Sequence, residues 1–149
     1  MVRFYTWCGS HLGAAKVIGG VWLVCNVLNM LQCAISLGNL EELNLSQDWK
    51  IGFQIAIGFF GVMVLMDIAL IYGAEMKIAW ILGTWAVITG SYSIFFMIAA
   101  IETGDPFTIE TWVVECVFNT YAILNVVAAV HEIKCEKQNV VMKEGKILK

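Results

Sequence analysis

Four long apolar runs, separated by short polar segments, make up most of the chain. They extend from Ala14 to Leu37, from Ile51 to Tyr72, from Ile78 to Ile101 and from Thr111 to His131. Each run is about as long as the roughly 20 apolar residues with which a helix crosses a bilayer. Because the bilayer core offers the backbone no water, each run must satisfy its own hydrogen bonds, and the pattern predicts four membrane-spanning helices.

The composition agrees with this pattern, since 60% of the 149 residues are hydrophobic and only 14% are charged. Soluble domains are typically about 25% charged. The chain also lacks the basic excess typical of proteins that bind nucleic acid. The predicted fold is an all-α integral membrane protein, in which residues 1–149 form a single compact four-helix transmembrane bundle with a short tail at residues 132–149.

The charges outside the runs are sorted by sign. Eight of the nine basic residues lie before or at the start of the first run, between the second and third, or after the fourth, and only Lys50 lies on the other side. Basic residues accumulate in cytoplasmic segments, so the N and C termini are both predicted to be cytoplasmic. The opposite side carries six acidic residues, which are Glu41, Glu42, Asp48, Glu102, Asp105 and Glu110.

Two carboxylates fall inside the predicted spans, where ionisable residues are costly and indicate function. Asp67 is about one and a half turns from the cytoplasmic end of the second span, and Glu115 is about one turn from the outer end of the fourth. We expect them near opposite faces and not close together. Lys16 and Lys77 are near enough to the cytoplasmic edge to reach toward Asp67.

Amide side chains are the other polar groups inside the spans. Asn26, Asn29 and Gln32 form a stripe on one face of the first span, and Asn119 and Asn125 lie in the fourth. Such groups commonly hydrogen-bond between membrane helices. Together with the two carboxylates, they are the residues we predict to contact other helices or a partner. Small residues that would permit close helix packing include Ala15, Gly19, Gly58, Gly61, Gly83, Ala86 and Gly90.

Three further residues are candidates for modification. Cys8 and Cys135 lie next to the membrane on the predicted cytoplasmic side, where palmitoylation occurs. Asn44 begins an Asn-Leu-Ser glycosylation sequon in the first outer loop. Cys33 and Cys116 lie toward the outer ends of their spans and could meet, although free cysteine also packs as a small apolar residue.

The sequence offers no residue set suited to catalysis. Ser46 and Ser91 have no histidine at a matching depth, and no phosphate-binding or dinucleotide-binding glycine motif occurs. His11 and His131 are isolated, and no cysteine or histidine spacing suits a metal ion. We therefore expect no enzymatic activity, no catalytic or metal-binding residue and no cofactor.

One segment resembles a known family. Residues 72–81 read Tyr-Gly-Ala-Glu-Met-Lys-Ile-Ala-Trp-Ile, which is similar to the corresponding cytoplasmic turn of the lysosome-associated transmembrane (LAPTM) family. The first span, with Gly13 followed by Gly20-Val21-Trp22, is also similar to the opening of that family. The resemblance implies a plasma-membrane or endolysosomal protein that binds other membrane proteins or sorting machinery. The family's Pro-Pro-x-Tyr motifs do not occur, since the only proline is Pro106.

These observations favour a noncatalytic accessory subunit or adaptor. We expect it to be embedded in lipid, to pack laterally on a larger integral membrane protein and to bind no nucleic acid; the small residues allow a homo-oligomer without requiring one. The alternative is a transporter in which Asp67, Glu115 and the amide stripe of the first span line a path for protons or a small solute. Lipid organisation without a specific partner is a third hypothesis.

Overall fold

The computed structural model describes residues 10–39, 47–103 and 106–147, and these form four helices with no strand among them. They are α1 (His11–Gly38), α2 (Gln47–Glu75), α3 (Ala79–Thr103) and α4 (Pro106–Ile147). Each helix contains most or all of one predicted run and extends past it. The hydroxyl of Ser10 caps α1 by accepting a hydrogen bond of 3.0 Å from the backbone of Gly13. Proline at the first position of α4 suits a helix start, because its missing N–H has no partner there.

Three stretches are long and apolar enough to cross a membrane. They are His11–Gly38, Lys50–Glu75 and Trp112–Met142, and they identify the chain as an integral membrane protein by length and composition. Their apolar side chains point outward, as lipid-facing residues do; Ile35, Leu65 and Val117 are more than 60% exposed. In α3, the described apolar stretch Ala79–Phe95 is shorter. That α3 is a fourth span therefore stays a prediction.

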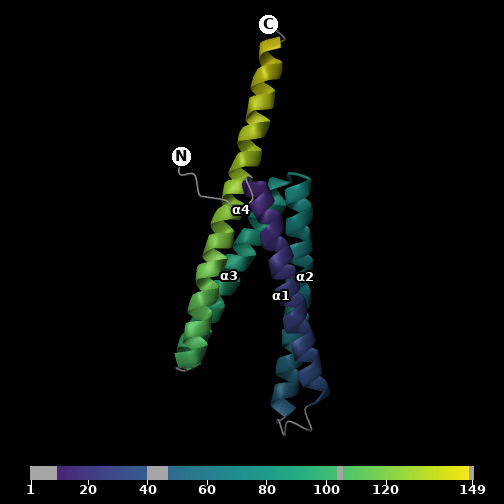
Figure 1. The fold of residues 1–149 in the computed structure, drawn as a ribbon, viewed down its shortest axis with the longest axis vertical. Coiled ribbons are helices and arrows are strands. Elements are labelled where there is room, and N and C mark those ends of the chain that lie inside the picture. Colours follow the sequence, from purple (N-terminus) through teal and green to yellow (C-terminus); the bar gives the residue numbers. More distant parts are fainter. Residues whose placement is uncertain (1–9, 40–46, 104–105, 148–149) are drawn as a thin grey trace.

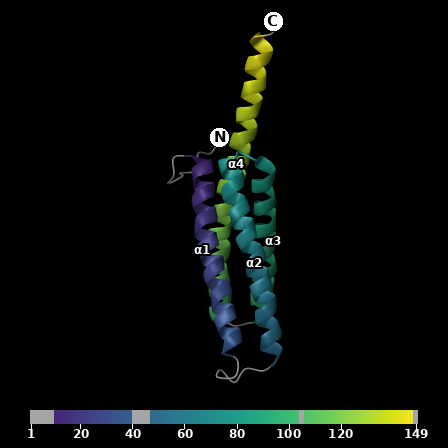
Figure 2. The same ribbon diagram turned by 90° about the vertical axis from the view of Figure 1, so that its right-hand side faces the viewer.

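The helices are arranged as two pairs that diverge (Figure 1). Helix α1 packs along α2, and α3 packs along α4. We call the end where the pairs meet the closed end; it holds the start of α1 and the α2–α3 turn. At the open end, where α1 and α3 finish, the pairs are far apart. A view at right angles shows the four helices nearly parallel (Figure 2), so the divergence is confined to one plane.

The open arrangement differs from the compact bundle that the sequence predicts, and the side chains explain the difference. At the closed end the facing residues are small or well packed, including Ala14, Ala15 and Gly19. Farther along α1, toward the open end, Asn29 and Gln32 are polar, and neither makes a hydrogen bond with another described residue. A ring contact joins the two pairs beyond the closed end, where Phe59 of α2 stacks on Tyr92 of α3 with centroids 5.0 Å apart, and the amides of α1 add no bond to it.

A buried core holds the closed end together. Leu70 of α2, Leu82 and Trp85 of α3, and Val126 and Ile133 of α4 are almost completely buried. The exposed edge of this core carries two ion pairs. Lys16 of α1 pairs with Glu75 of α2, and both Glu136 oxygens of α4 accept hydrogen bonds from Lys77, at 2.7 and 2.8 Å.

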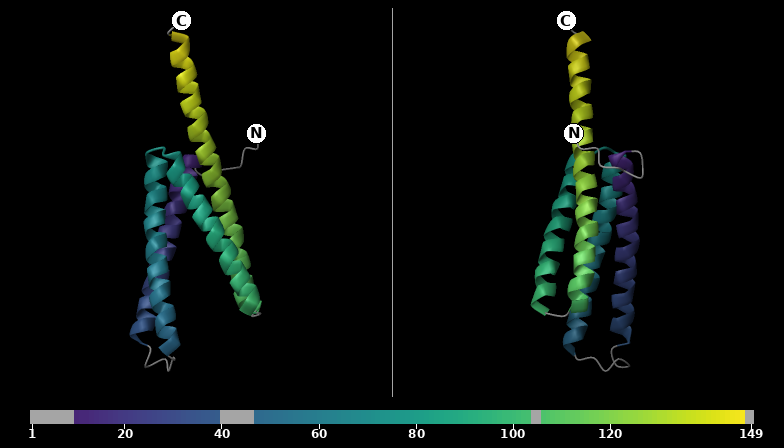
Figure 3. Two further views of the ribbon diagram at one scale, coloured as in Figure 1. Left: turned by 180° about the vertical axis from the view of Figure 1, so that it is seen from behind. Right: turned by 60° about the vertical axis from the view of Figure 1, so that its left-hand side comes forward.

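The segment predicted as a tail continues α4 as a helix. The helix runs on through the closed end to Ile147 and projects well beyond the other three helices (Figure 3). Six lysines of the described helices and turn belong to this end or to the part of α4 beyond it: Lys16, Lys77, Lys134, Lys137, Lys143 and Lys146. The start of α1, the α2–α3 turn and the end of α4 thus share one end of the molecule. Its cytoplasmic location remains a prediction.

Small residues permit close packing at fewer positions than the sequence predicts. A methyl group on Gly19 would lie 2.7 Å from Ile71 Cγ1 and 3.3 Å from the backbone oxygen of Asp67. Gly90 has an ordinary neighbour, Ile123, at 3.6 Å. By contrast, Gly58, Gly61 and Gly83 have nothing within 4 Å, so the prediction that they mark tight helix contacts is wrong. Two of these three lie in the part of α2 that runs toward the open end.

Gly19→Leu should destabilise the closed end, and Gly20→Leu is its matched control. The Gly19 side chain would overlap α2, and overpacking of this kind typically costs about 1–3 kcal/mol. Gly20 has no atom within 4 Å, so the same change there should leave stability equal or slightly higher. Thermal unfolding in mild detergent compares the two. Equal melting temperatures for the two variants would contradict the close contact.

Candidate functional site

Asp67 is completely buried and joins three helices by its side chain. Its Oδ2 accepts a hydrogen bond of 2.8 Å from Asn26 Nδ2 of α1. Its Oδ1 accepts one of 3.0 Å from the indole Nε1 of Trp85 on α3. The residue itself belongs to α2, so α1, α2 and α3 meet at one carboxyl group.

The two lysines that the sequence places within reach of Asp67 do not pair with it in the structure. Lys16 and Lys77 are held by Glu75 and Glu136 at the edge of the closed end. Neutral N–H donors from the helices satisfy Asp67 instead. The buried carboxyl group and its two donors stabilise the fold together. Removing any one of the three leaves a polar group unpaired in a poorly solvated place.

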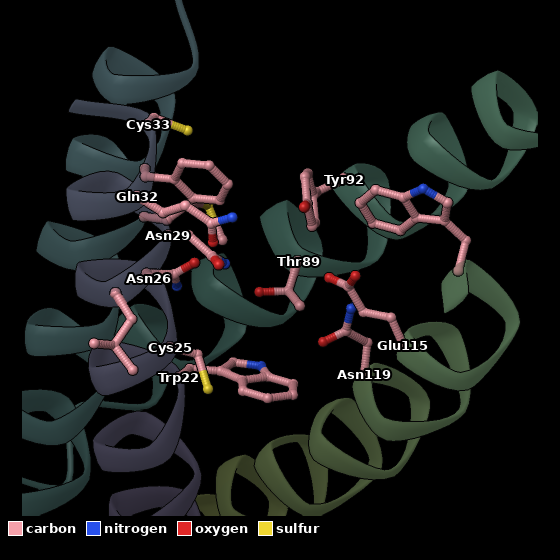
Figure 4. A pocket seen from close by; sticks show the side chains of 14 residues that line it. Trp22, Cys25, Asn26, Asn29, Gln32, Cys33, Thr89, Tyr92, Glu115 and Asn119 are labelled. Carbon is pink, nitrogen blue, oxygen red and sulfur yellow. The ribbon is translucent and has the colours of Figure 1, made fainter. Parts of the chain in front are cut away.

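Beside this contact lies a cavity of about 620 Å³, between the two helix pairs (Figure 4). One wall is α1, which contributes Trp22, Asn26, Asn29 and Gln32. The facing wall is α4, and α3 closes the space between them. Figure 4 shows the side chains from both walls directed into the same space. The cavity is also lined by Cys25, Leu28, Cys33, Phe60, Met63, Thr89, Tyr92, Trp112, Glu115 and Asn119.

Glu115 and Asn119 form the polar part of the α4 wall. They lie one turn apart, and the Asn119 side chain hydrogen-bonds the Glu115 carboxylate. The Asn119 amide also donates a bond of 2.9 Å to Ser93 Oγ of α3. Ser93 Oγ in turn donates to the backbone oxygen of Thr89 at 2.9 Å. The carboxylate is therefore positioned by a chain of hydrogen bonds that also joins α3 to α4.

The structure brings together most of the predicted contact residues. Asn26, Asn29, Gln32, Glu115 and Asn119 line the one cavity, and Asp67 is bonded to its wall through Asn26. The sequence placed Asp67 and Glu115 apart without predicting that one cleft would link them. The exception is Asn125, which is buried elsewhere and donates to the Tyr121 backbone oxygen of its own helix at 2.9 Å.

Of the predicted modification sites, Cys135 belongs to the described part of the chain, and it does not line this cleft. Cys135 is half-buried at the closed end, and its sulfur lies 3.5 Å from His131 Nδ1. Cys33 and Cys116 are both free thiols, so they form no disulfide with each other. Cys8 and Asn44 lie outside the described residues. Palmitoylation and glycosylation at these positions remain predictions.

Two residues of the site were missed by sequence reasoning. The sequence pattern assigns no role to Trp85, yet it is buried against Asp67. A signal was available, because Asp67 is eight residues before the end of α2 and Trp85 is six residues after the start of α3, which places them at similar depth. Thr89 lines the cavity, and its Oγ1 is buried without a hydrogen-bond partner among the described residues. No sequence signal distinguishes it.

Comparisons with protein-family models, with curated proteins and with solved structures give no match to this chain. The chemistry of the site must therefore be argued from its geometry. Within the described part of the chain, no three His, Cys, Asp or Glu side chains are grouped so that they could hold a metal ion. What the cleft does offer is one carboxylate, several amides and aromatic faces, a set suited to binding.

Asp67→Leu should destabilise the helix assembly more than Asp67→Asn does. Leucine leaves the Asn26 and Trp85 donors unpaired, at about 1–3 kcal/mol for each. Asparagine keeps one acceptor oxygen for Trp85, and Asn26 can turn its amide to accept from the new NH₂ group. Thermal unfolding in detergent measures the order. Asn29→Leu is the control, because Asn29 lies one turn from Asn26 along the same face of α1. This variant should change stability little, and a loss of stability equal to that of Asp67→Leu would contradict the assignment.

Proposed function

We propose that this chain is a noncatalytic four-span accessory subunit, which holds one transmembrane helix of a larger membrane protein in the cleft between α1 and α4. The observation that carries the proposal is the divergence of the two helix pairs around a largely apolar cavity of about 620 Å³, whose wall also carries amides and one carboxylate. Helix α3, with 25 residues, serves as the fourth span, since at 1.5 Å per residue it is about 37 Å long.

The polar side chains of the cleft favour an occupant. Asn29 and Gln32 are exposed in the isolated chain and have no described hydrogen-bond partner. Each polar group that faces lipid without a partner costs about 1–3 kcal/mol by the measure of protein substitutions. A partner helix that supplies hydrogen bonds removes this cost. The helix also covers the aromatic faces of Trp22 and Trp112, which line the same space.

The closed end argues against the alternative of a transport path. Between the cavity and that end lie the apolar side chains of Leu70, Leu82 and Val126, all fully buried. Asp67, which a proton path would use, is engaged by Asn26 and Trp85 on both of its oxygens. A cleft that leads to a packed core is better suited to holding a ligand than to conducting one.

The same proposal sets the orientation and the membrane. The closed end, with its lysines, is cytoplasmic, because basic residues are retained on that side. The resemblance of residues 72–81 to the LAPTM family favours a plasma-membrane or endolysosomal location and a role in binding other membrane proteins.

Site-specific photocrosslinking in cells tests the proposal. A photoreactive amino acid at Asn29 or Gln32 should crosslink to a transmembrane segment of another protein, mapped by sequencing the joined peptides. The same probe at Leu31 or Ile35, which are exposed but do not line the cavity, should label mainly lipid. Crosslinks that map only to lipid from all four positions would overturn the proposal, and crosslinks to the same chain would assign the cleft to a homo-oligomer.

A matched pair of variants separates cleft binding from contact elsewhere. Cys25→Trp fills the cavity from the α1 wall, whereas Val24→Trp adds the same bulk at the preceding residue, which is exposed and does not line the cavity. The crosslink from Gln32 should fall several-fold with Cys25→Trp and persist with Val24→Trp. Equal yields in both variants would show that the partner does not occupy the cavity.

A further inference from the structure

We infer that the cleft recognises a basic side chain, so that the partner helix carries a lysine or arginine within its transmembrane segment. This inference rests on the proposed function and names the chemistry of its partner. It follows from the charge of the cavity wall and from the hydrogen-bonding groups that the wall presents.

Glu115 supplies the charge. It is the one acidic residue among the described residues that line the cavity, and that lining contains no lysine, arginine or histidine. The two ion pairs of the described chain join Lys16 to Glu75 and Lys77 to Glu136, and neither involves Glu115. A carboxylate in a poorly solvated cleft is matched best by a positive charge brought by the ligand.

Two oxygen atoms, from Asn26 of α1 and Thr89 of α3, face the cavity beside the amides of Asn29 and Gln32, which carry both oxygen and N–H groups. The Nδ2 of Asn26 donates a hydrogen bond to Asp67. This bond orients the amide oxygen of Asn26 away from Asp67 and toward the cavity (Figure 4). Asp67 thereby determines which end of the amide a ligand meets. Thr89 adds a hydroxyl oxygen that is buried, has no described partner and points across the cavity in Figure 4. Both oxygens suit an ammonium or guanidinium donor.

Aromatic faces complete the set. Trp22 of α1 and Trp112 of α4 line the same space, together with Tyr92 of α3, whose ring stacks on Phe59 and meets Trp112 edge to face. The face of an aromatic ring attracts a cation, and tryptophan does so most strongly. A carboxylate, acceptor oxygens and aromatic faces around one cavity all favour the same kind of ligand, which is an organic cation. The sideways opening between two helix pairs then favours a cation carried on a helix over a free one.

The experiment uses designed transmembrane peptides as probes. A leucine–alanine helix carries lysine, arginine, glutamine, glutamate or leucine at its centre, and each peptide is reconstituted with the full-length protein in vesicles. Energy transfer between labelled peptide and protein measures association. The lysine and arginine peptides should bind about tenfold more tightly than the leucine peptide, near the upper end of what polar contacts contribute between membrane helices.

Two variants of α4 make the test specific. Glu115→Gln should abolish the preference for basic peptides, whereas Glu110→Gln removes an exposed carboxylate of the same helix that does not line the cavity and should leave the preference intact. Thermal unfolding of both variants checks that they fold. Glu115→Leu gives a second reading and should bind the leucine peptide at least as well as the wild type does.

Each of the remaining outcomes would contradict a specific part of the inference or of the proposed function. If all peptides bind equally, and filling the cleft with Cys25→Trp blocks them, helix binding stands and recognition of a basic side chain fails. If no peptide associates, both the inference and the proposed helix docking fail. If free methylammonium or guanidinium protects Glu115 from carbodiimide labelling while the peptides do not bind, the cation site is real and its ligand is a small molecule.

Discussion

The side chain of Asp67 is the contact on which the arrangement of the helices depends. It is buried in α2 and takes one hydrogen bond from α1 and another from α3. In a bilayer, apolar surfaces gain little by associating with each other rather than with lipid tails, so packing and polar contacts must select one arrangement. Gly19 allows α1 to approach α2 at this level, since its missing side chain leaves room for Ile71. The polar bond and the small residue therefore act at the same place.

The cleft forms because such contacts are distributed unevenly along the helices. The closed end has the buried core, the close glycine and the ion pairs, whereas the half of α1 and α2 nearer the open end has amides and glycines without neighbours. Helix α3 follows α4, to which it is joined through Ser93 and Asn119. Two well-packed pairs that share one end must separate at the other, and the polar residues lie between them.

Much of the fold could be predicted from the pattern of apolar residues, and the site only in part. Continuous runs such as Ile51 to Tyr72 mark helices because no other backbone structure survives in lipid, and the described helices contain them. The polar side chains of α1 and α4 were identified because they are rare in such runs. Their assembly around one cavity depends on the angle between helix pairs, which a one-dimensional pattern does not encode. Thr89 was missed for the same reason, since threonine is unremarkable in a membrane helix until its neighbours are known.

The length of α4 connects the cleft to the far side of the molecule. One continuous helix of 42 residues, about 63 Å long, carries Glu115 on the cavity wall, Glu136 at the ion pair with Lys77, and a segment that extends freely beyond it. Such a helix behaves as a stiff lever, and the closed end is its fulcrum. An object that widens or narrows the cleft rotates the projecting arm in the opposite sense. Under the proposed function, a partner helix that entered the cleft would displace this arm beyond the closed end, without any change in the fold of the helix itself.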